Sequence, residues 1–332
     1  MLNIHNGDSS ANIARESSVS GEHFAFRESL ITGPTPAAVS GDEWRARRAQ
    51  HLSESYGVDL QECERGLLDL EKKLSSFAEH EEVVLWFEHD LFCQTNLLYL
   101  LNWFAQQQMR NTKLSLICIG EFPGKENFRG LGELNGQQMA SLFPGRQEVT
   151  LAQLNLAESG WQAYCAPDPT DIEKVLQANA SLLPFLAPAL EAHLRRFPST
   201  KNSLGRIEDK ALELIDGGAK TFLDLFPSFS DAEPIYGLGD AQLWLALERI
   251  SGAKQPLLTI ENGNNPGQQP TPDTVRKAKF ELTETGESVL RGEADYVELN
   301  GIDHWLGGVH LSPDNLWRWD ESSASIATNR GA

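Results

Sequence analysis

The segment VVLWFEHDLFCQTNLLYLL, residues 83–101, decides the fold that we expect for this chain. Its first five residues, Val83–Phe87, form a continuous apolar run, which is typical of a strand buried on both faces. Three polar residues then end the strand, and the last of them, Asp90, is suited to cap a long apolar helix that extends to about Gln108. A buried strand followed directly by a helix predicts one unit of a parallel α/β sheet.

The chain on either side of this segment repeats the alternation of strands and helices. Further strands are expected at Leu2–His5, His23–Phe26 and Leu114–Ile119, and helices at 42–52 and 58–78. Strands that alternate with helices predict a parallel sheet with right-handed crossovers. We therefore expect residues 1–134 to form a Rossmann-like α/β domain with a binding site at its strand ends.

The remainder of the chain predicts a different organisation. Residues 135–204 have a mainly helical pattern punctuated by prolines, and we interpret them as a helical bridge. Residues 205–319 contain amphipathic helices followed by two short strands around the polar loop Glu261–Asp273, which predicts a winged-helix-like α+β domain. Residues 320–332 contain few apolar side chains, so we expect a frayed tail.

Composition excludes several classes of protein. The 332 residues are 40% hydrophobic, which suffices for a packed core and excludes global disorder. They include 47 acidic and 28 basic residues, a net charge of -19, which disfavours a general electrostatic grip on nucleic acid or anionic lipid. No apolar run reaches the roughly 18 residues of a membrane span, and we expect no signal peptide. The four cysteines lack a disulfide or zinc spacing, so we expect a cytoplasmic protein with reduced thiols.

Polar residues follow each of the four expected strands. They form the segments His5–Ser10, of which His5 ends the first strand itself, Arg27–Glu28, Glu88–Asp90 and Gly120–Glu121. In an open parallel sheet, ligands bind outside the carboxyl ends of the strands. We call these four segments the strand-end rim and predict that they share one site.

The rim residues suit a small anionic or nucleotide-like ligand. Asn6, Gly7, Ser9 and Ser10 place a glycine turn and two hydroxyls that can cap a helix where backbone N–H groups attract phosphate or carboxylate. Arg27 would hold an anionic group in bidentate fashion. The remaining binding candidates are Glu28, Asp90 and Arg47. Turn formation and helix capping explain several of these residues equally well.

Some rim residues also indicate acid–base or metal chemistry. His89 is our candidate general acid or base, because neighbouring carboxylates raise the pKa of an imidazole. Asp8 and Glu88 are the accompanying catalytic carboxylates. His5, Asp8, Glu88 and His89 could instead hold a divalent metal ion, although no HxxxH or HxH spacing supports one. Cys93 follows the expected helix start, where a thiolate would be stabilised.

Three segments outside the rim are further candidates. The basic cluster Trp44–Arg48 is either an anion-binding face that covers the rim or a solvated helix face. Gly130–Glu133 is either a plain turn or a loop whose glycines let the backbone approach a ligand. Asn300–His310, with two histidines and a tryptophan, is either a turn packed on a core aromatic or a second binding surface.

Several segments together resemble a bacterial family, domain of unknown function 1835. They are residues 4–11 (IHNGDSSA), 26–36 (FRESLITGPTP), 44–49, 83–101, 114–120, 130–135, 236–250 and 280–311. The FEHDLF segment and the NGDS start are the most specific of these. The resemblance implies that the polar exits of the first three strands belong to one site, and it supplies no established activity. The family pattern has an acid where this chain has Cys93, which weakens a metal-ligand role for that position.

The sequence leaves three functions open. The first is an enzyme or binder that acts on a small anionic or nucleotide-like ligand at the rim, by hydrolysis or group transfer, with or without a divalent metal. The alternative is a ligand-sensing transcriptional regulator, although residues 200–319 carry 11 basic and 19 acidic residues, which makes DNA an unfavourable partner. The third is a homodimer or protein-interaction module that docks through Trp305 and Leu306.

Overall fold

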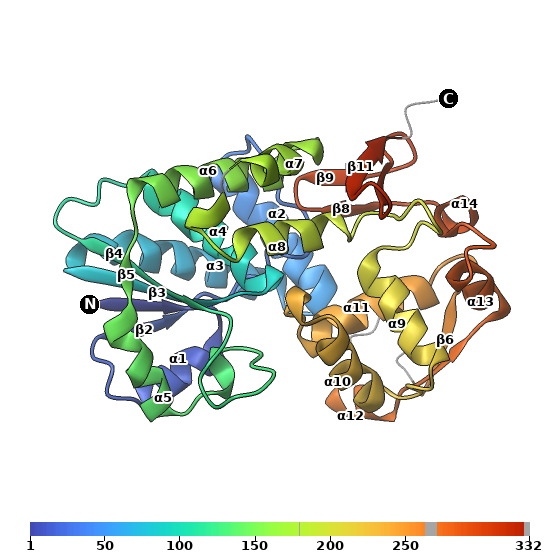
Figure 1. Ribbon diagram of the computed structural model, residues 1–332, viewed down its shortest axis with the longest axis horizontal. Coiled ribbons are helices and arrows are strands. Elements are labelled where there is room, and N and C mark those ends of the chain that lie inside the picture. The colour runs from blue at the N-terminus through green and yellow to red at the C-terminus, as the bar shows by residue number, and fades with distance from the viewer. Residues whose placement is uncertain (179, 263–270, 329–332) are drawn as a thin grey trace.

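The computed structural model describes residues 1–178, 180–262 and 271–328. An α/β part that contains the N-terminus occupies one side of the molecule, and a mainly helical part formed by the chain after residue 205 occupies the other (Figure 1). Within the described residues, none of the helices is long and apolar enough to cross a membrane.

A five-stranded sheet forms the core of the α/β part. Its strands are β1 (Leu2–His5), β2 (Glu22–Ala25), β3 (Glu82–Glu88), β4 (Lys113–Ile119) and β5 (Gln147–Glu148). They lie in the order β2-β1-β3-β4-β5, and β1 to β4 are parallel, which confirms the expected parallel sheet. The short β5 runs antiparallel to β4 and was not expected.

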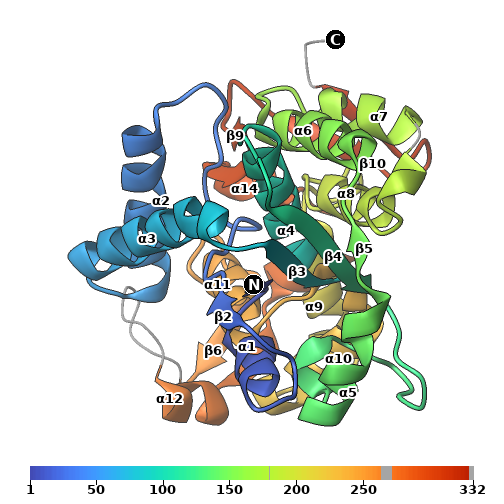
Figure 2. The same ribbon diagram turned by 90° about the vertical axis from the view of Figure 1, so that its left-hand side faces the viewer.

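Helices cover both faces of this sheet (Figure 2). Alternation along β3 defines the faces, because Val84 and Trp86 join one apolar core while Val83, Leu85 and Phe87 join the other. The first face is covered by α1 (Asp8–Arg15) and α5 (Gly136–Leu142), and the second by α3 (Leu60–Ser75) and α4 (Leu91–Ala105), with α6 (Leu151–Cys165) and α8 (Leu186–Leu194) packed on α4. The helices that leave the adjacent strands β1 and β3 therefore lie on opposite faces, which opens a crevice at their carboxyl ends.

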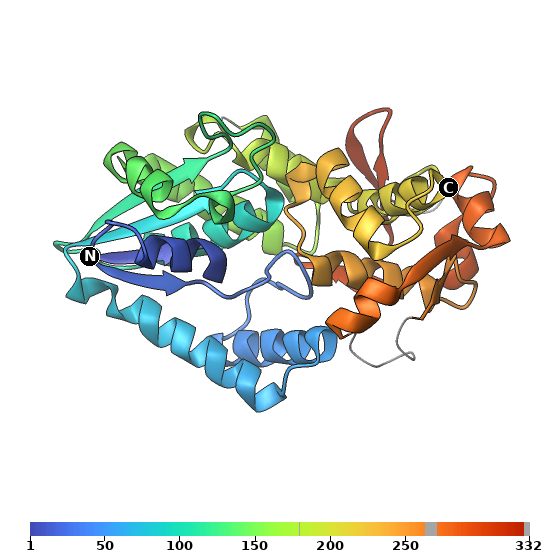
Figure 3. The same cartoon turned by 90° about the horizontal axis from the view of Figure 1, so that it is seen from below.

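Helix α2 (Gly41–Tyr56) packs on α3 and extends toward the second part of the molecule (Figure 3). Arg48, in the middle of α2, is fully buried and donates to the Glu28 carboxylate at 2.7 Å and to backbone carbonyls of residues 29–34. At the end of the helix, the Tyr56 hydroxyl accepts a hydrogen bond from Gln242 at 3.1 Å. Helix α2 thus fixes the loop after β2 and connects it to the second part.

Leu212, Leu225, Trp244 and Phe280 of the second part belong to an apolar core that also includes Leu91 of α4 and Ala189 of α8. The elements of the second part are α9 (Arg206–Asp216), α10 (Phe222–Ala232), the 3-10 helix η5 (Pro234–Tyr236), α11 (Asp240–Ser251), α12 (Pro272–Lys277), α13 (Glu284–Leu290), α14 (Tyr296–Asn300) and the antiparallel pair β6 (Leu258–Glu261) and β7 (Lys279–Leu282). Helices and a two-stranded sheet are present as predicted. Of the polar loop expected between the two strands, residues 263–270 lie outside the described residues.

The end of the chain returns to the α/β part as two hairpins. They are formed by β8 (His304–Leu306) with β9 (Val309–Leu311), and by β10 (Trp317–Asp320) with β11 (Ser325–Thr328). Leu306 and Trp319 belong to the same apolar core as α4 and α8. The expected frayed tail is therefore wrong for residues 320–328, because β11 pairs with β10, and residues 329–332 lie outside the described residues.

Candidate functional site

A cavity of about 460 Å³ lies at the crevice between the carboxyl ends of β1 and β3. Five residues of the strand-end rim line it, namely Asn6, Ser9, Ser10, Glu88 and Asp90. The opposite wall comes from α10, η5 and the start of α11, which lie more than a hundred residues further along the chain. We call this the strand-end cavity. The structure thus brings the exits of β1 and β3 together, as expected for a parallel sheet.

Three acidic side chains form the base of the cavity. Glu88, Asp90 and Cys93 are all buried, and one ligand atom from each lies within 4.8 Å of the others. The Cys93 thiol donates to Oε2 of Glu88 at 2.7 Å, and the Leu131 N–H donates to Oε1 at 2.7 Å. Asp90 caps α4 by accepting from the Cys93 N–H at 2.9 Å, as its position before the helix predicted.

Burial dominates the electrostatics of these groups. It raises the pKa of Glu88 from 4.5 to about 7, and the negative charge of Asp90 raises the same pKa further. Burial also raises the pKa of Asp90 and holds the pKa of the Cys93 thiol well above its ordinary value. In the part of the chain that the structure describes, neither carboxylate forms an ion pair. These neighbouring acids oppose the thiolate that the start of a helix would otherwise stabilise at Cys93.

A network of amides fixes this cluster. Asn6 donates to the Cys93 sulfur at 2.6 Å and accepts from Asn96 at 2.8 Å. Gln94 donates to the Glu88 backbone carbonyl at 2.6 Å. Asn96 and Gln94 both lie in the buried first turns of α4, so the segment that defines the fold also orients the acidic groups.

Glycines let the backbone close on the carboxylates from two sides. Gly237, with φ +59°, lies so close to Asp90 that a Cβ at this position would overlap the carboxylate. A Cβ on Gly130 would lie 3.0 Å from Oε1 of Glu88, so the Gly130–Glu133 loop approaches the site as one of our interpretations proposed. An exposed ion pair between Arg129 and Asp231 connects this loop to α10. The cavity is thus closed by both parts of the chain.

Two rim residues pair with each other instead of facing the cavity. Arg27 forms a bidentate ion pair with Asp8, at 2.7 and 2.8 Å, and both side chains are largely exposed. Arg27 is therefore not placed as a clamp in the strand-end cavity, and neither residue lines it. Gly7, with φ +101°, is the N-cap of α1, which begins at Asp8, so the serines that we expected to precede this helix lie within its first turn.

Two further candidates lie within the folded core. Glu28 is buried and bound by Arg48, so its carboxylate stabilises the loop after β2 and does not face the cavity. His5 lies on the face of the sheet that α1 covers, where it stacks on Trp86 and shares a 3.0 Å hydrogen bond with His23. Burial lowers the pKa of His5 to about 3. His5 is thus a neutral side chain of the sheet face, and it is not in the group of possible metal ligands that the described residues form.

His89 does not accompany Glu88 into the cavity. Consecutive residues of an extended chain point to opposite faces of a sheet. Glu88, the last residue of β3, points into the cavity, so His89, which follows it, points to the other side. There its ring lies 6.0 Å from that of Phe185, and its Cβ is near Gly120. His89 lines neither the strand-end cavity nor the larger cavity described below, whereas Arg47 lines the larger one. The structure therefore gives no support to His89 as the general acid or base.

Sequence reasoning missed the residues that the second part contributes, namely Glu233, Gly237 and Gln242. It also missed Arg129, whereas Glu133 belongs to the Gly130–Glu133 loop that one interpretation placed near a ligand. The glycines of residues 237–239 and the acid at 133 were visible as loop signals, but no local pattern indicates which loop meets which strand end. No protein-family model matches the chain, and no curated protein matches its sequence.

Proposed function

We propose that this protein is an enzyme that moves a proton to or from a small polar substrate in the strand-end cavity, with Glu88 as the general acid or base. The observation that carries the proposal is the cluster of Glu88, Asp90 and Cys93, which are buried together and which no described lysine or arginine pairs with. Burying negative charge without a partner is costly, so such clusters occur where function requires them. A carboxyl with a pKa of about 7 is half protonated near neutrality, which suits transfer in both directions.

The chemistry fits hydrolysis or group transfer. Ionised Glu88 takes a proton from water or from a substrate hydroxyl as its oxygen attacks, and protonated Glu88 returns that proton to the leaving group. Asp90, fixed by the cap of α4, and the Cys93 thiol position the Glu88 carboxyl. Glu133 and Glu233 add two acids to the walls against the single arginine Arg129. The charge of the cavity thus favours a neutral or positively charged substrate over the anionic ligand expected from the sequence.

A divalent metal ion is the second candidate, and the spacing of Glu88, Asp90 and Cys93 favours it. Two carboxylates and one thiol would match Zn²⁺ better than Mg²⁺, because Mg²⁺ takes oxygen ligands. A cation would compensate the buried negative charge and would allow an anionic substrate. His5, Asp8 and His89 do not belong to this set, so it differs from the metal site expected from the sequence.

We also propose the finer assignments of fold and location. The strand order β2-β1-β3-β4-β5 supports a Rossmann-like α/β domain, and the helices followed by β6 and β7 support a winged-helix-like module. We propose that this module covers the strand-end cavity and contacts no DNA, since its acids outnumber its bases. The proposal also includes membership of the domain of unknown function 1835 family. It further includes a cytoplasmic location with reduced thiols, and a homodimer or protein partner.

The test compares Glu88→Gln with His89→Gln. Chromogenic esters, amides and glycosides, with neutral and amine-bearing members, are assayed with chelator-treated protein and again with Zn²⁺, Mn²⁺ or Mg²⁺. We expect Glu88→Gln to abolish turnover and His89→Gln to retain it. Turnover in the chelated protein supports proton transfer alone, and restoration by one metal supports the second candidate. Equal turnover by Glu88→Gln and the unmodified protein would contradict both.

A further inference from the structure

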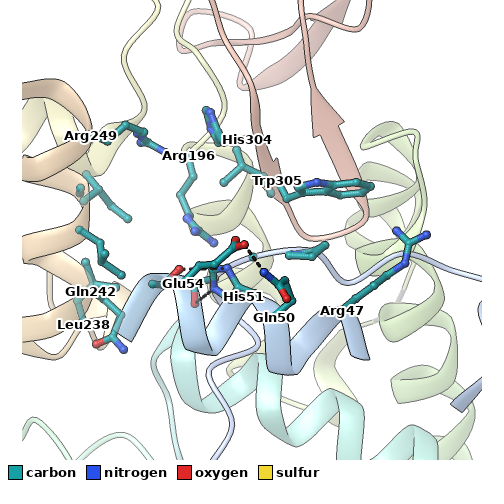
Figure 4. A pocket seen from close by; sticks show the side chains of 18 of the residues that line it. Arg47, Gln50, His51, Glu54, Arg196, Leu238, Gln242, Arg249, His304 and Trp305 are labelled. Carbon is teal, nitrogen blue, oxygen red and sulfur yellow. Dashed lines mark hydrogen bonds between the residues drawn. The ribbon is translucent and has the colours of Figure 1, made fainter. Parts of the chain in front are cut away.

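A second cavity, of about 690 Å³, lies apart from the acidic cluster. It is formed where α2 meets α9, α11 and the β8 strand, and Figure 4 shows its side chains. Its volume is within the usual range for small-molecule sites, roughly 300–1,000 Å³. We call it the α2 cavity. It takes in residues from two segments that the sequence singled out, Trp44–Arg48 and Asn300–His310.

More arginines than acids line the α2 cavity, although the protein as a whole is strongly acidic. Three arginines line it, Arg47, Arg196 and Arg249, against the acids Glu54 and Glu208. Arg47 pairs with Glu43, and Arg249 pairs with Glu208. The two histidines of the wall add no charge near neutral pH, because burial lowers the pKa of His51 to about 3 and holds that of His304 well below its ordinary value.

Arg196 differs from the other two arginines of this cavity. Across the described ranges, it forms no ion pair, and its Nε is buried without a hydrogen-bond partner. Its other nitrogens contact neutral groups, the Ile31 carbonyl at 2.8 Å and the His193 ring at 3.3 Å. In Figure 4 its guanidinium points into the space above α2. A half-buried guanidinium fixed by neutral partners is preorganised for an anion.

Trp305 offers a second kind of contact in the same cavity. One face of its indole is covered by the His310 ring, with 4.7 Å between centroids and 10° between planes. The other face is therefore the one that a ligand can stack on. In Figure 4 the Trp305 ring lies across the cavity from α2, on the side where Arg47 projects. The cavity thus combines a guanidinium without an ion pair among the described residues with a flat aromatic surface.

We propose that the α2 cavity is a binding site for a mononucleotide-like molecule, an anionic group attached to a planar ring. Arg196 binds the phosphate, and Trp305 stacks on the base. The small anionic or nucleotide-like ligand that the sequence predicted is thereby moved from the strand-end rim to this cavity, where Arg196 can bind an anionic group. The inference does not depend on the reaction proposed for Glu88, since it uses none of the same acidic side chains.

Calorimetric titration of the full chain with AMP, GMP, CMP and UMP tests the proposal. The corresponding nucleosides lack the phosphate, and ribose 5-phosphate lacks the ring. We expect at least one nucleotide to bind below about 1 mM, and its nucleoside and ribose 5-phosphate to bind at least about tenfold more weakly. Equal binding of ribose 5-phosphate would overturn the stacking role of Trp305, and no nucleotide binding would overturn the site.

Variants assign the binding to this cavity. Arg196→Met and Trp305→Leu should each weaken the nucleotide at least about tenfold. Arg129→Met, which removes an arginine from the strand-end cavity, should bind as the unmodified protein does. If Arg196→Met fails to fold by circular dichroism, Arg196→Lys and Trp305→Leu provide the decision. Unchanged binding in both of these, or loss confined to Arg129→Met, would overturn the proposal.

Discussion

The unfolding free energy of Glu88→Gln should rise relative to that of the unmodified chain as the pH is raised from acidic to alkaline values. The pKa of Glu88 is raised from 4.5 to about 7 on folding, so the native state holds a proton that the unfolded chain releases between these values. Stability is therefore lost as the pH rises through this window. Gln carries no titrating proton, and the variant escapes that loss.

The magnitude follows from the shift. A difference of 2.5 pKa units, 7 minus 4.5, corresponds to about 3.4 kcal/mol once the pH exceeds both values. At about pH 5.5 roughly 1.4 kcal/mol of this is already lost, so about 2 kcal/mol separates pH 5.5 from pH 8.5. The difference in unfolding free energy between Glu88→Gln and the unmodified protein should grow by that amount. Any fixed cost of placing an amide beside Leu131 and Cys93 cancels in the comparison.

Urea unfolding at the two pH values measures this growth. Glu133→Gln serves as the matched control, because it changes an exposed carboxylate that lines the same cavity. A growth of the difference that occurs only in Glu88→Gln assigns the effect to the buried carboxyl. If the Glu88→Gln difference is the same at both pH values, the carboxyl does not hold its proton on folding, and the reasoning that makes it the acid or base is refuted.

Three further predictions concern the contacts around the site. Gly237→Ala should destabilise the chain by about 2–5 kcal/mol in urea unfolding, through the positive φ and the overlap with Asp90; a loss below that of an ordinary surface substitution would contradict the close approach. Arg48→Met should cost about 3–5 kcal/mol in the same assay, because it leaves Glu28 buried without its partner, and restoration by Glu28→Gln would identify the cause. Cys93 should react with iodoacetamide at pH 7.5 far more slowly than a free thiol does, because burial and neighbouring acids raise its pKa; rapid labelling detected by mass spectrometry would show an accessible thiolate.

The sheet was predictable because its signal is local. Val83–Phe87 is apolar without interruption, and a strand buried under helices on both faces requires that composition. The start of α4 could be predicted from Asp90 for an equally local reason, because the Asp90 carboxylate caps the helix. Parallel strands in turn place their exits at one edge, so Asn6 and Glu88 could be assigned to one site from the sequence.

The failures have physical reasons as well. Glu88 and His89 were taken together, although alternation along the strand sends only one of them into the cavity. Arg27 and Glu28 are likewise separated in the structure. Arg27 forms an ion pair with Asp8 on the surface, and Glu28 forms one with Arg48 in the interior. The wall around Gly237 was unpredictable, because it depends on how the second part of the chain packs against the first, and that packing leaves no periodic trace in the sequence.

Leu238 and Gln242 line both the strand-end cavity and the α2 cavity, so a single layer of side chains separates them. Gln242 is held there by Tyr56 on one side and by the Gly239 N–H on the other. A ligand that shifts this layer from either side changes the shape of the neighbouring space. Thermodynamic linkage makes such an effect reciprocal. If a ligand in one cavity changes the affinity of the other cavity for its ligand, the second ligand changes the affinity for the first by the same factor. The partition thus provides a route by which one small molecule can regulate the chemistry performed on another.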